Sequence, residues 1–269
     1  MAPTSWQRAP KSLQRFGLGG SPRVLRAWVV AAALLTGFAA AGLAVAQEEE
    51  APRAAVKGRV TGGDLLLNPV WNEARDPSNH RYTFRAPSVT VSQKAKKLTA
   101  FLPKEVPIVV LGEGAKPASA AYEIQVSGGR TTPVTVVIPD GQSVQFVNRD
   151  PFRHTVYTKD TKQGGLPAQP MEKGKSRTWT PPGPGVYEIR DELFPSIRSW
   201  IVVEAKAVAS GYPDLGGEFQ IGDLPLGTYK LQAYFNGKPT GTALDIEVRQ
   251  FPELQQLSDP VVVAEKKKK

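Results

Sequence analysis

The 269-residue sequence contains no cysteine. This absence excludes disulfide bonds, a lipidated N-terminal cysteine, a thiol nucleophile and every metal site that uses a thiolate. An exported chain without disulfides depends on its hydrophobic core for stability. The length that follows residue 46 is enough for one large or two small β domains, so such a core can form.

Histidine is almost as scarce, with two residues in the whole chain. His80 lies beside Arg81 in a polar, irregular segment, which is typical of a surface position. His154 lies at the start of a short predicted strand. Methionine also occurs twice, and no cysteine, histidine or methionine follows residue 171.

Catalytic motifs are missing as well. The sequence has no G-x-S-x-G, phosphate-binding P-loop, dinucleotide-binding fingerprint or H-E-x-x-H. Asp191 and Glu192 are adjacent carboxylates, but neighbouring residues of a strand point to opposite faces and would not act on one substrate. We therefore expect a protein that is not an enzyme.

The N-terminal 46 residues have the parts of a secretory signal peptide. Five basic and no acidic residues precede an apolar run at 27–46, which ends in Ala44-Val45-Ala46 before a polar stretch. A basic region, an apolar core and an A-x-A site predict cleavage after Ala46 and a periplasmic or extracellular protein. The alternative is an uncleaved membrane anchor, because about 20 apolar residues can span a bilayer.

The high positive charge comes largely from the two ends of the chain. The sequence has 34 basic and 25 acidic residues, five of the basic ones lie in the leader, and the chain ends in four lysines. No dense basic patch remains in between, so the electrostatic footprint of a nucleic-acid-binding protein is absent. We expect no nucleic-acid partner.

Short β-strand patterns dominate from residue 107 onward. Apolar or alternating runs are separated by glycine and proline turns, and no long helical periodicity is present. This pattern predicts an all-β sandwich fold. Asn236-Gly237, between two alternating runs, predicts a two-residue hairpin turn. Residues 72–106 read as a long loop with one short helical turn, and the tail from residue 251 as frayed.

Residues 131–204 resemble the cupredoxin-like domains of the plastocyanin and methylamine-utilisation type found in bacterial exported proteins. The resemblance rests on the motif V-x-F-x-N-x-D, from Val144 to Asp150, followed after three residues by His154-Thr155-Val156. It implies a Greek-key sandwich. In that family one histidine from this strand and a late loop of the form C-x-x-H-x-x-M bind copper, a ligand set that suits both copper oxidation states.

The late loop of this sequence departs from the family's ligand pattern. His154 falls on the first histidine, but Asp191 stands in place of the cysteine, Phe194 of the second histidine and Ile197 of the methionine. The resemblance thus implies a degenerate copper site without type 1 copper, whose space the two apolar residues fill. The alternative is an atypical zinc or copper(II) site that uses His154 and Asp191, which two ligands alone would hold weakly.

A second resemblance concerns the last third of the chain. Residues 217–231 read G-x-F-x-I-x-x-L-P-x-G-x-Y-x-L and resemble the second half of a carboxypeptidase-regulatory-like, transthyretin-type β sandwich. Residues 56–60 and 67–70 are similar to its first half. Two arrangements remain open. The two halves can form one discontinuous domain interrupted by the cupredoxin-like stretch, or the segments can follow one another as separate units along the chain. The resemblance implies a non-catalytic module.

The expected organisation combines these assignments. A larger Greek-key cupredoxin-like sandwich is accompanied by a second, smaller β-sandwich module. The expected parts are a signal peptide (1–46), a linker (47–54), an N-terminal β segment (55–120), a cupredoxin-like domain (121–205), a carboxypeptidase-regulatory-like β segment (206–250) and a basic tail (251–269).

Two functions fit this organisation. The first is an exported, non-catalytic binding or scaffolding protein without a cofactor, which joins an unidentified protein or envelope polymer. The second is a periplasmic metal-handling or electron-transfer copper protein with an atypical site around His154. Trp179, Trp200 and Tyr234 are candidates for an aromatic binding face, and their alternative place is the sandwich core.

Overall fold

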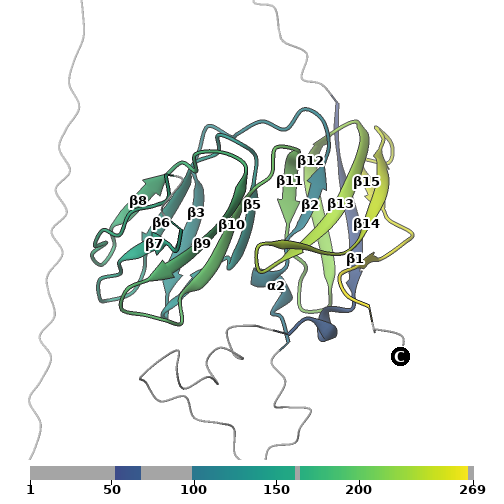
Figure 1. Cartoon of the computed structure of the whole chain (residues 1–269). Coiled ribbons are helices and arrows are strands. Elements are labelled where there is room, and N and C mark those ends of the chain that lie inside the picture. The colour runs from purple at the N-terminus through teal and green to yellow at the C-terminus, as the bar shows by residue number, and fades with distance from the viewer. Residues whose placement is uncertain (1–51, 68–98, 161–163, 266–269) are drawn as a thin grey trace, which may run out of the picture. The chain divides into compact units, whose positions relative to one another are not determined.

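The computed structural model describes residues 52–67, 99–160 and 164–265, and these residues form an almost entirely β structure (Figure 1). The predicted all-β fold class is thereby confirmed. The elements in chain order are β1 (Arg53–Thr61), η1 (Gly63–Leu65), α2 (Leu102–Glu105), β2 (Ile108–Leu111), β3 (Tyr122–Ser127), β4 (Arg130–Thr132), β5 (Thr135–Ile138), β6 (Val144–Asn148), β7 (Val156–Thr158), β8 (Ser176–Trp179), β9 (Gly185–Asp191), β10 (Arg198–Val203), β11 (Ala207–Gly211), β12 (Glu218–Pro225), β13 (Gly227–Phe235), β14 (Lys238–Val248), β15 (Leu254–Gln256) and β16 (Val261–Val262).

Strands β3 to β10 form one sandwich, which we call the cupredoxin-like sandwich. Its two sheets have the strand orders β4-β3-β6-β8 and β5-β10-β9-β7. The pairs β3 with β6 and β5 with β10 are parallel, and the other pairs are antiparallel. Side chains from both sheets, including Phe146, Val156, Ile189 and Ile201, enclose one buried core.

The remaining strands form a second sandwich, which we call the split sandwich. One sheet has the order β11-β2-β13-β14, and the other holds β12, β1 and β15, with β16 also paired to β1. Val56 of β1 lies opposite Ile221 of β12, and β1 also pairs with β15 and β16, so the first and the last strands of the described chain are joined. The strands of the cupredoxin-like sandwich lie between these segments in the sequence.

The two sandwiches meet through strands that are buried on both faces. β10 reads RSWIVV, and Ile201 and Val203 enter the core of the cupredoxin-like sandwich. Val202 faces the other way and packs in a cluster that also contains Tyr234 of β13. A continuous apolar run is the expected sequence of a strand covered on both sides. Tyr212 adds a polar tie, because its hydroxyl donates to the backbone carbonyl of Thr135 at 2.6 Å.

The turn between β13 and β14 follows the sequence pattern. Asn236 and Gly237 have φ values of 51° and 75°, and Phe235 pairs with Lys238 across the turn. Positive φ at both central residues is the geometry that Asn-Gly favours in a two-residue hairpin. This turn contacts the cupredoxin-like sandwich, where Trp200 lies against it.

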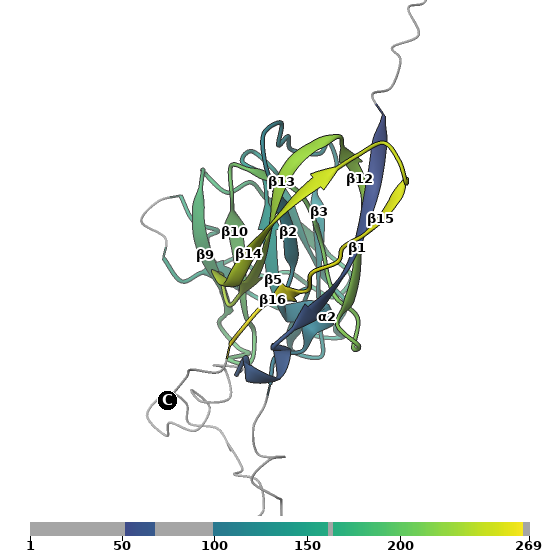
Figure 2. The same cartoon turned by 90° about the vertical axis from the view of Figure 1, so that its right-hand side faces the viewer.

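Two of the predicted boundaries are wrong. The sequence predicts a linker at 47–54, but Arg53 and Ala54 belong to β1 and pair with β12. The tail was expected to be frayed, yet β15 and β16 run parallel to β1, as Figure 2 shows. Val261 and Val263 are fully buried there, because their apolar side chains complete the core of the split sandwich.

Several expectations lie outside the described residues. They include the signal peptide, most of the segment 72–106, and His80. Within the described ranges, none of the helical segments has the length and apolar character needed to cross a bilayer.

Candidate functional site

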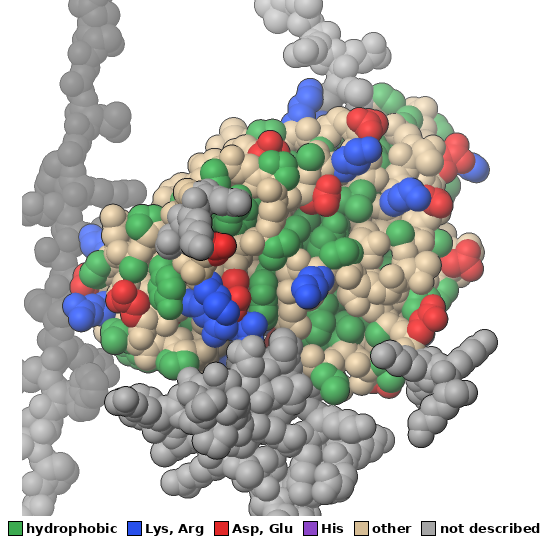
Figure 3. Space-filling view, in the orientation of Figure 1, with side chains coloured by type: hydrophobic (Ala, Val, Ile, Leu, Met, Phe, Trp, Pro, Cys, Tyr) green, Lys and Arg blue, Asp and Glu red, His purple; other side chains and the backbone are tan. Residues whose placement is uncertain are grey.

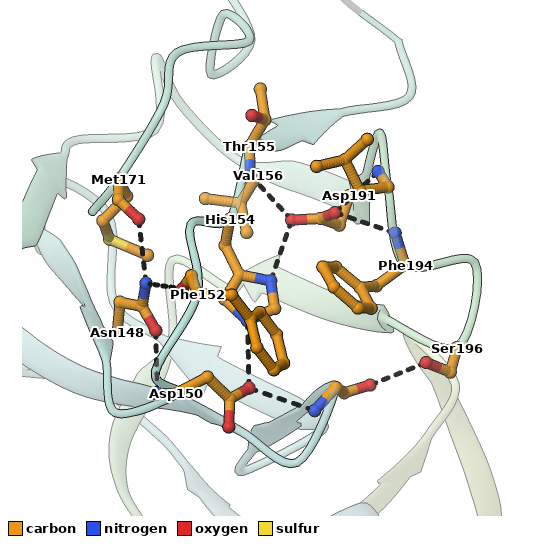
Figure 4. A network of polar contacts seen from close by, with 12 residues as sticks. Asn148, Asp150, Phe152, His154, Thr155, Val156, Met171, Asp191, Phe194 and Ser196 are labelled. Atoms are coloured by element: carbon orange, nitrogen blue, oxygen red, sulfur yellow. Dashed lines mark hydrogen bonds and ion pairs between the residues drawn. The ribbon is translucent and has the colours of Figure 1, made fainter. Parts of the chain in front are cut away.

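His154 lies in a loop that the family motif holds in place. The side chain of Asn148, at the end of β6, donates to the carbonyls of Phe152 and Met171, each at 2.8 Å. Its carbonyl oxygen accepts from the backbone N–H of Asp150 at 2.9 Å. His154 and Met171 exchange backbone hydrogen bonds of 3.1 and 2.7 Å. Asn148 therefore fixes the loop that presents Asp150 and His154 (Figure 4).

Asp150 contacts the histidine ring from one side. Its Oδ2 lies 2.9 Å from Nε2 of His154. The turn between β3 and β4 supplies two more donors, the backbone N–H groups of Gly128 and Gly129, at 2.7 and 3.1 Å. Both glycines have positive φ, a conformation that costs glycine little. Burial raises the pKa of Asp150, but these N–H groups and His154 outweigh it and hold this pKa below its ordinary value.

Asp191 contacts the ring from the other side. Its Oδ2 lies 3.2 Å from Nδ1 of His154 and accepts from the backbone N–H of Thr155 at 2.8 Å. Its Oδ1 accepts from the N–H groups of Leu193 and Phe194 at 2.8 and 2.9 Å. The carboxylate therefore links the late loop to the histidine loop. The adjacent Glu192 is exposed, so the two carboxylates do not form a pair.

The histidine ring is enclosed between these carboxylates. The His154 side chain is 0% exposed, and each ring nitrogen faces one aspartate oxygen. A ring nitrogen that carries hydrogen donates to the carboxylate oxygen that it faces. A hydrogen bond to an ionised carboxylate is charge-assisted and stronger than a neutral one. We call Asp150, His154 and Asp191 the histidine clamp.

Aromatic rings cover the clamp. The Phe152 and Phe194 rings stack with centroids 4.8 Å apart, and they lie 5.1 and 4.8 Å from the His154 ring. Ile197 is fully buried in the core beneath the same loop. Ser196 ties the loop to the β3–β4 turn, because its hydroxyl donates to the carbonyl of Gly129 at 2.8 Å. Apolar and aromatic atoms therefore occupy the surroundings of the clamp.

The clamp does not fit a copper ion. Both imidazole nitrogens point at carboxylate oxygens in direct contact, and the loop provides no sulfur ligand. Within the part of the chain that the structure describes, no group of three or more His, Cys, Asp or Glu side chains is arranged to hold a metal ion. The pair His154 and Asp191, which the sequence identified as a weak candidate, is joined by a hydrogen bond.

Two of the three candidates for an aromatic binding face are buried in the structure. Trp200 is 6% exposed and Tyr234 is 3% exposed, because both lie where the two sandwiches pack together. Trp179 is half-buried and meets Tyr187 edge to face, with the ring centroids 5.2 Å apart. Burial on both faces of β10 explains why Trp200 does not face solvent.

Sequence reasoning missed the role of Asp150. The family motif contains this residue but does not predict its contact with His154. The available signal was the separation of four residues within one short loop, with the two glycines at 128 and 129 as distant donors. Only the fold brings the β3–β4 turn to this loop.

Comparison with solved structures finds cupredoxins over about a third of the chain. A purple cupredoxin from Nitrosopumilus maritimus is 20% identical, covers 31% of this chain and 99% of its own, and has a TM-score of 0.28. A reduced point mutant of amicyanin is 20% identical and covers 36% and 98%, with a TM-score of 0.29. A copper-containing nitrite reductase from Thermus scotoductus SA-01 is 24% identical and covers 35% and 25%, with a TM-score of 0.30.

These likenesses concern the fold alone. No family model matches the chain, and no curated protein matches it. The similarity of the split sandwich to carboxypeptidase-regulatory-like modules therefore stays a prediction.

Proposed function

We propose that this protein is an exported, non-catalytic binding or scaffolding protein whose cupredoxin-like sandwich works without copper. The observation that carries the proposal is the histidine clamp. Both nitrogens of His154 are taken by Asp150 and Asp191, at 2.9 and 3.2 Å. A metal ion at this position would have to displace a carboxylate that is already bonded to the backbone.

The clamp gives His154 a structural role that does not depend on a metal ion. Asp191 alone receives hydrogen bonds from the N–H of Thr155 in one loop and of Leu193 and Phe194 in another. The loops that would be joined through a copper ion in the family are here joined through a side chain. The sandwich can then serve as a rigid support without a cofactor.

The junction of the two sandwiches supports a scaffolding role. Val202, Val109 and Tyr234 form a shared buried cluster, and Tyr212 adds a hydrogen bond across the junction. Apolar packing of this kind resists separation of the domains. The basic leader and apolar run of residues 1–46 support export, and N-terminal sequencing of the protein from the culture fluid or periplasm tests it.

A metal titration tests the metal-free proposal. The purified protein is freed of metal with EDTA, dialysed, and titrated with copper(II) and with zinc by calorimetry and visible absorption. We expect no binding tighter than about 10 μM and no intense visible band. The matched variants are His154→Ala and His80→Ala, which remove the two histidines one at a time.

The variants make the result decisive. One-to-one binding that is lost in His154→Ala and kept in His80→Ala would overturn the proposal and support a metal-handling protein. Binding lost only in His80→Ala would locate a metal outside the clamp and would equally contradict a metal-free protein.

A further inference from the structure

Two phenylalanine rings and a leucine form an apolar surface over the histidine clamp. Phe152 is 41% exposed and Leu193 is 54% exposed. The Phe152 ring stacks on the half-buried ring of Phe194, and Figure 4 shows both phenylalanines beside the clamp. An exposed proline adjoins each loop segment in the sequence. We call this surface the apolar cap, and its residues are Pro151, Phe152, Leu193, Phe194 and Pro195.

The exposed side chain of Leu193 has no part in the clamp itself. Leu193 contributes its backbone N–H, which donates to Asp191 at 2.8 Å, and almost any residue type could make that hydrogen bond. Its side chain instead extends the apolar surface of the stacked rings. Exposed apolar surfaces of this kind mark contacts with another molecule.

Charges of opposite sign lie on the two loops that carry the cap. Arg153 follows Phe152 in the histidine loop, and Glu192 precedes Leu193 in the late loop. Both side chains are exposed, and among the described residues neither has an ion-pair or hydrogen-bond partner. By contrast, Figure 3 shows many Lys and Arg side chains next to acidic ones on the face that it displays. Each loop of the cap thus offers one unpaired charge.

We propose that the apolar cap binds the apolar cap of a second copy of this chain in a two-fold symmetric dimer. In such an interface the same surface of both copies meets, so the histidine loop of one copy lies against the late loop of the other. Arg153 of each copy then faces the partner's Glu192. Two equivalent ion pairs flank an apolar centre, which is the usual arrangement of a polar rim around an apolar core.

A second copy suits the charges of this surface better than a charged polymer does. The exposed charges of Arg153 and Glu192 sum to zero, so a nucleic acid or an anionic lipid surface gains little attraction from them. The two loops are complementary to each other, because each carries the charge that the other lacks. Electrostatic complementarity of this kind fixes the orientation of two partners.

The small size of the contact predicts a weak dimer. The cap and its two flanking charges fall well short of the roughly 20–30 residues per partner that a stable interface uses. Contacts that bury less than about 1,200 Å² belong to transient complexes. We therefore expect a dissociation constant of about 10–100 μM.

Sedimentation velocity of the purified protein in EDTA tests the dimer. Between about 1 and 300 μM we expect the average mass to rise from that of the monomer towards that of the dimer. Leu193→Ser should raise the dissociation constant about tenfold, because an apolar side chain is removed from the interface. Leu215→Ser is the matched control and should leave association unchanged, since Leu215 is 78% exposed and lies in the turn before β12 of the split sandwich.

Charge reversal tests the two-fold arrangement. Arg153→Glu or Glu192→Arg alone places like charges opposite each other and should raise the dissociation constant at least about tenfold. The double variant restores both ion pairs with the charges exchanged, so its dissociation constant should return to within about threefold of the wild-type value. Both side chains are exposed, so urea unfolding of these variants should match that of the wild type.

Three results would overturn the dimer. They are a protein that stays monomeric at about 300 μM, equal losses in Leu193→Ser and Leu215→Ser, and a double charge variant that associates as poorly as the single variants. Self-association goes beyond the proposed function and needs no metal, so these failures leave the metal-free site untouched. A dimer that forms only when copper or zinc replaces EDTA would contradict both.

Discussion

Replacement of His154 by phenylalanine isolates the contribution of the histidine clamp to stability. A phenyl ring takes the place of the imidazole, so the aromatic contacts with Phe152 and Phe194 remain. The two polar contacts to Asp150 and Asp191 are lost. The substitution therefore removes the polar contacts of the ring while it keeps an aromatic side chain of similar size in the core.

The expected loss of stability follows from the contacts that the substitution removes. Hydrogen bonds to charged groups contribute about 1.5–3 kcal/mol each, and removal of one partner from a buried ionic group costs about 3–5 kcal/mol. Asp150 and Asp191 keep their backbone N–H donors, which limits the cost of leaving them without the ring. We expect His154→Phe to lower the free energy of unfolding by about 3–5 kcal/mol.

Urea unfolding followed by tryptophan fluorescence measures this change. Trp179 and Trp200 both lie in the cupredoxin-like sandwich and report on it. Phe194→Leu is the control, because it alters a ring against His154 without touching the charges, and should cost less than about 1.5 kcal/mol. If His154→Phe is as stable as the wild type, or if EDTA destabilises the wild type, the clamp is not what holds these loops.

Three further predictions follow from single features of the structure. Because the pKa of Asp150 is lowered in the folded state, its contribution to stability is full above about pH 4 and is lost as the pH falls through the folded-state pKa. Asp150→Asn should therefore reduce the decrease in melting temperature that the wild type shows below about pH 4. An equal decrease in both proteins would contradict this prediction. Gly237→Ala should lower the free energy of unfolding, measured with urea, by about 2–4 kcal/mol. The added Cβ atom would collide with Trp200, and the residue has a positive φ. An unchanged free energy of unfolding would show that the hairpin does not pack on Trp200. Deletion of residues 258–269 removes the buried side chains of Val261 and Val263. It should destabilise the split sandwich by about 3–6 kcal/mol, which thermal unfolding measures. If this segment only frays, the deletion would leave the stability unchanged.

The sequence predicted the fold class and the strand pattern well because both depend on local signals. Short apolar runs between glycine and proline turns gave the sandwich, and Asn236-Gly237 gave a turn with positive φ at both residues. The termini were harder to predict. β15 and β16 are short, and their pairing with β1 depends on a surface that only the folded sheet provides.

The contacts of the candidate site also differ in how far the sequence predicts them. The contact of His154 with Asp191 followed from the family register, because both stand at ligand positions of a known loop. The contact with Asp150 did not, since it depends on the N–H groups of Gly128 and Gly129, more than twenty residues earlier.

Asp191 joins the late loop to the histidine loop. Its Oδ1 accepts from the N–H of Leu193 in its own loop, while its Oδ2 accepts from the N–H of Thr155 and contacts His154 in the other. Under the proposed metal-free function, this connection takes the place of a metal bridge. An alanine here would leave those N–H groups without acceptors and the ring with one partner. The carboxylate therefore connects the two loops by itself, and the buried His154 ring adds a polar contact to the carboxylate on each side.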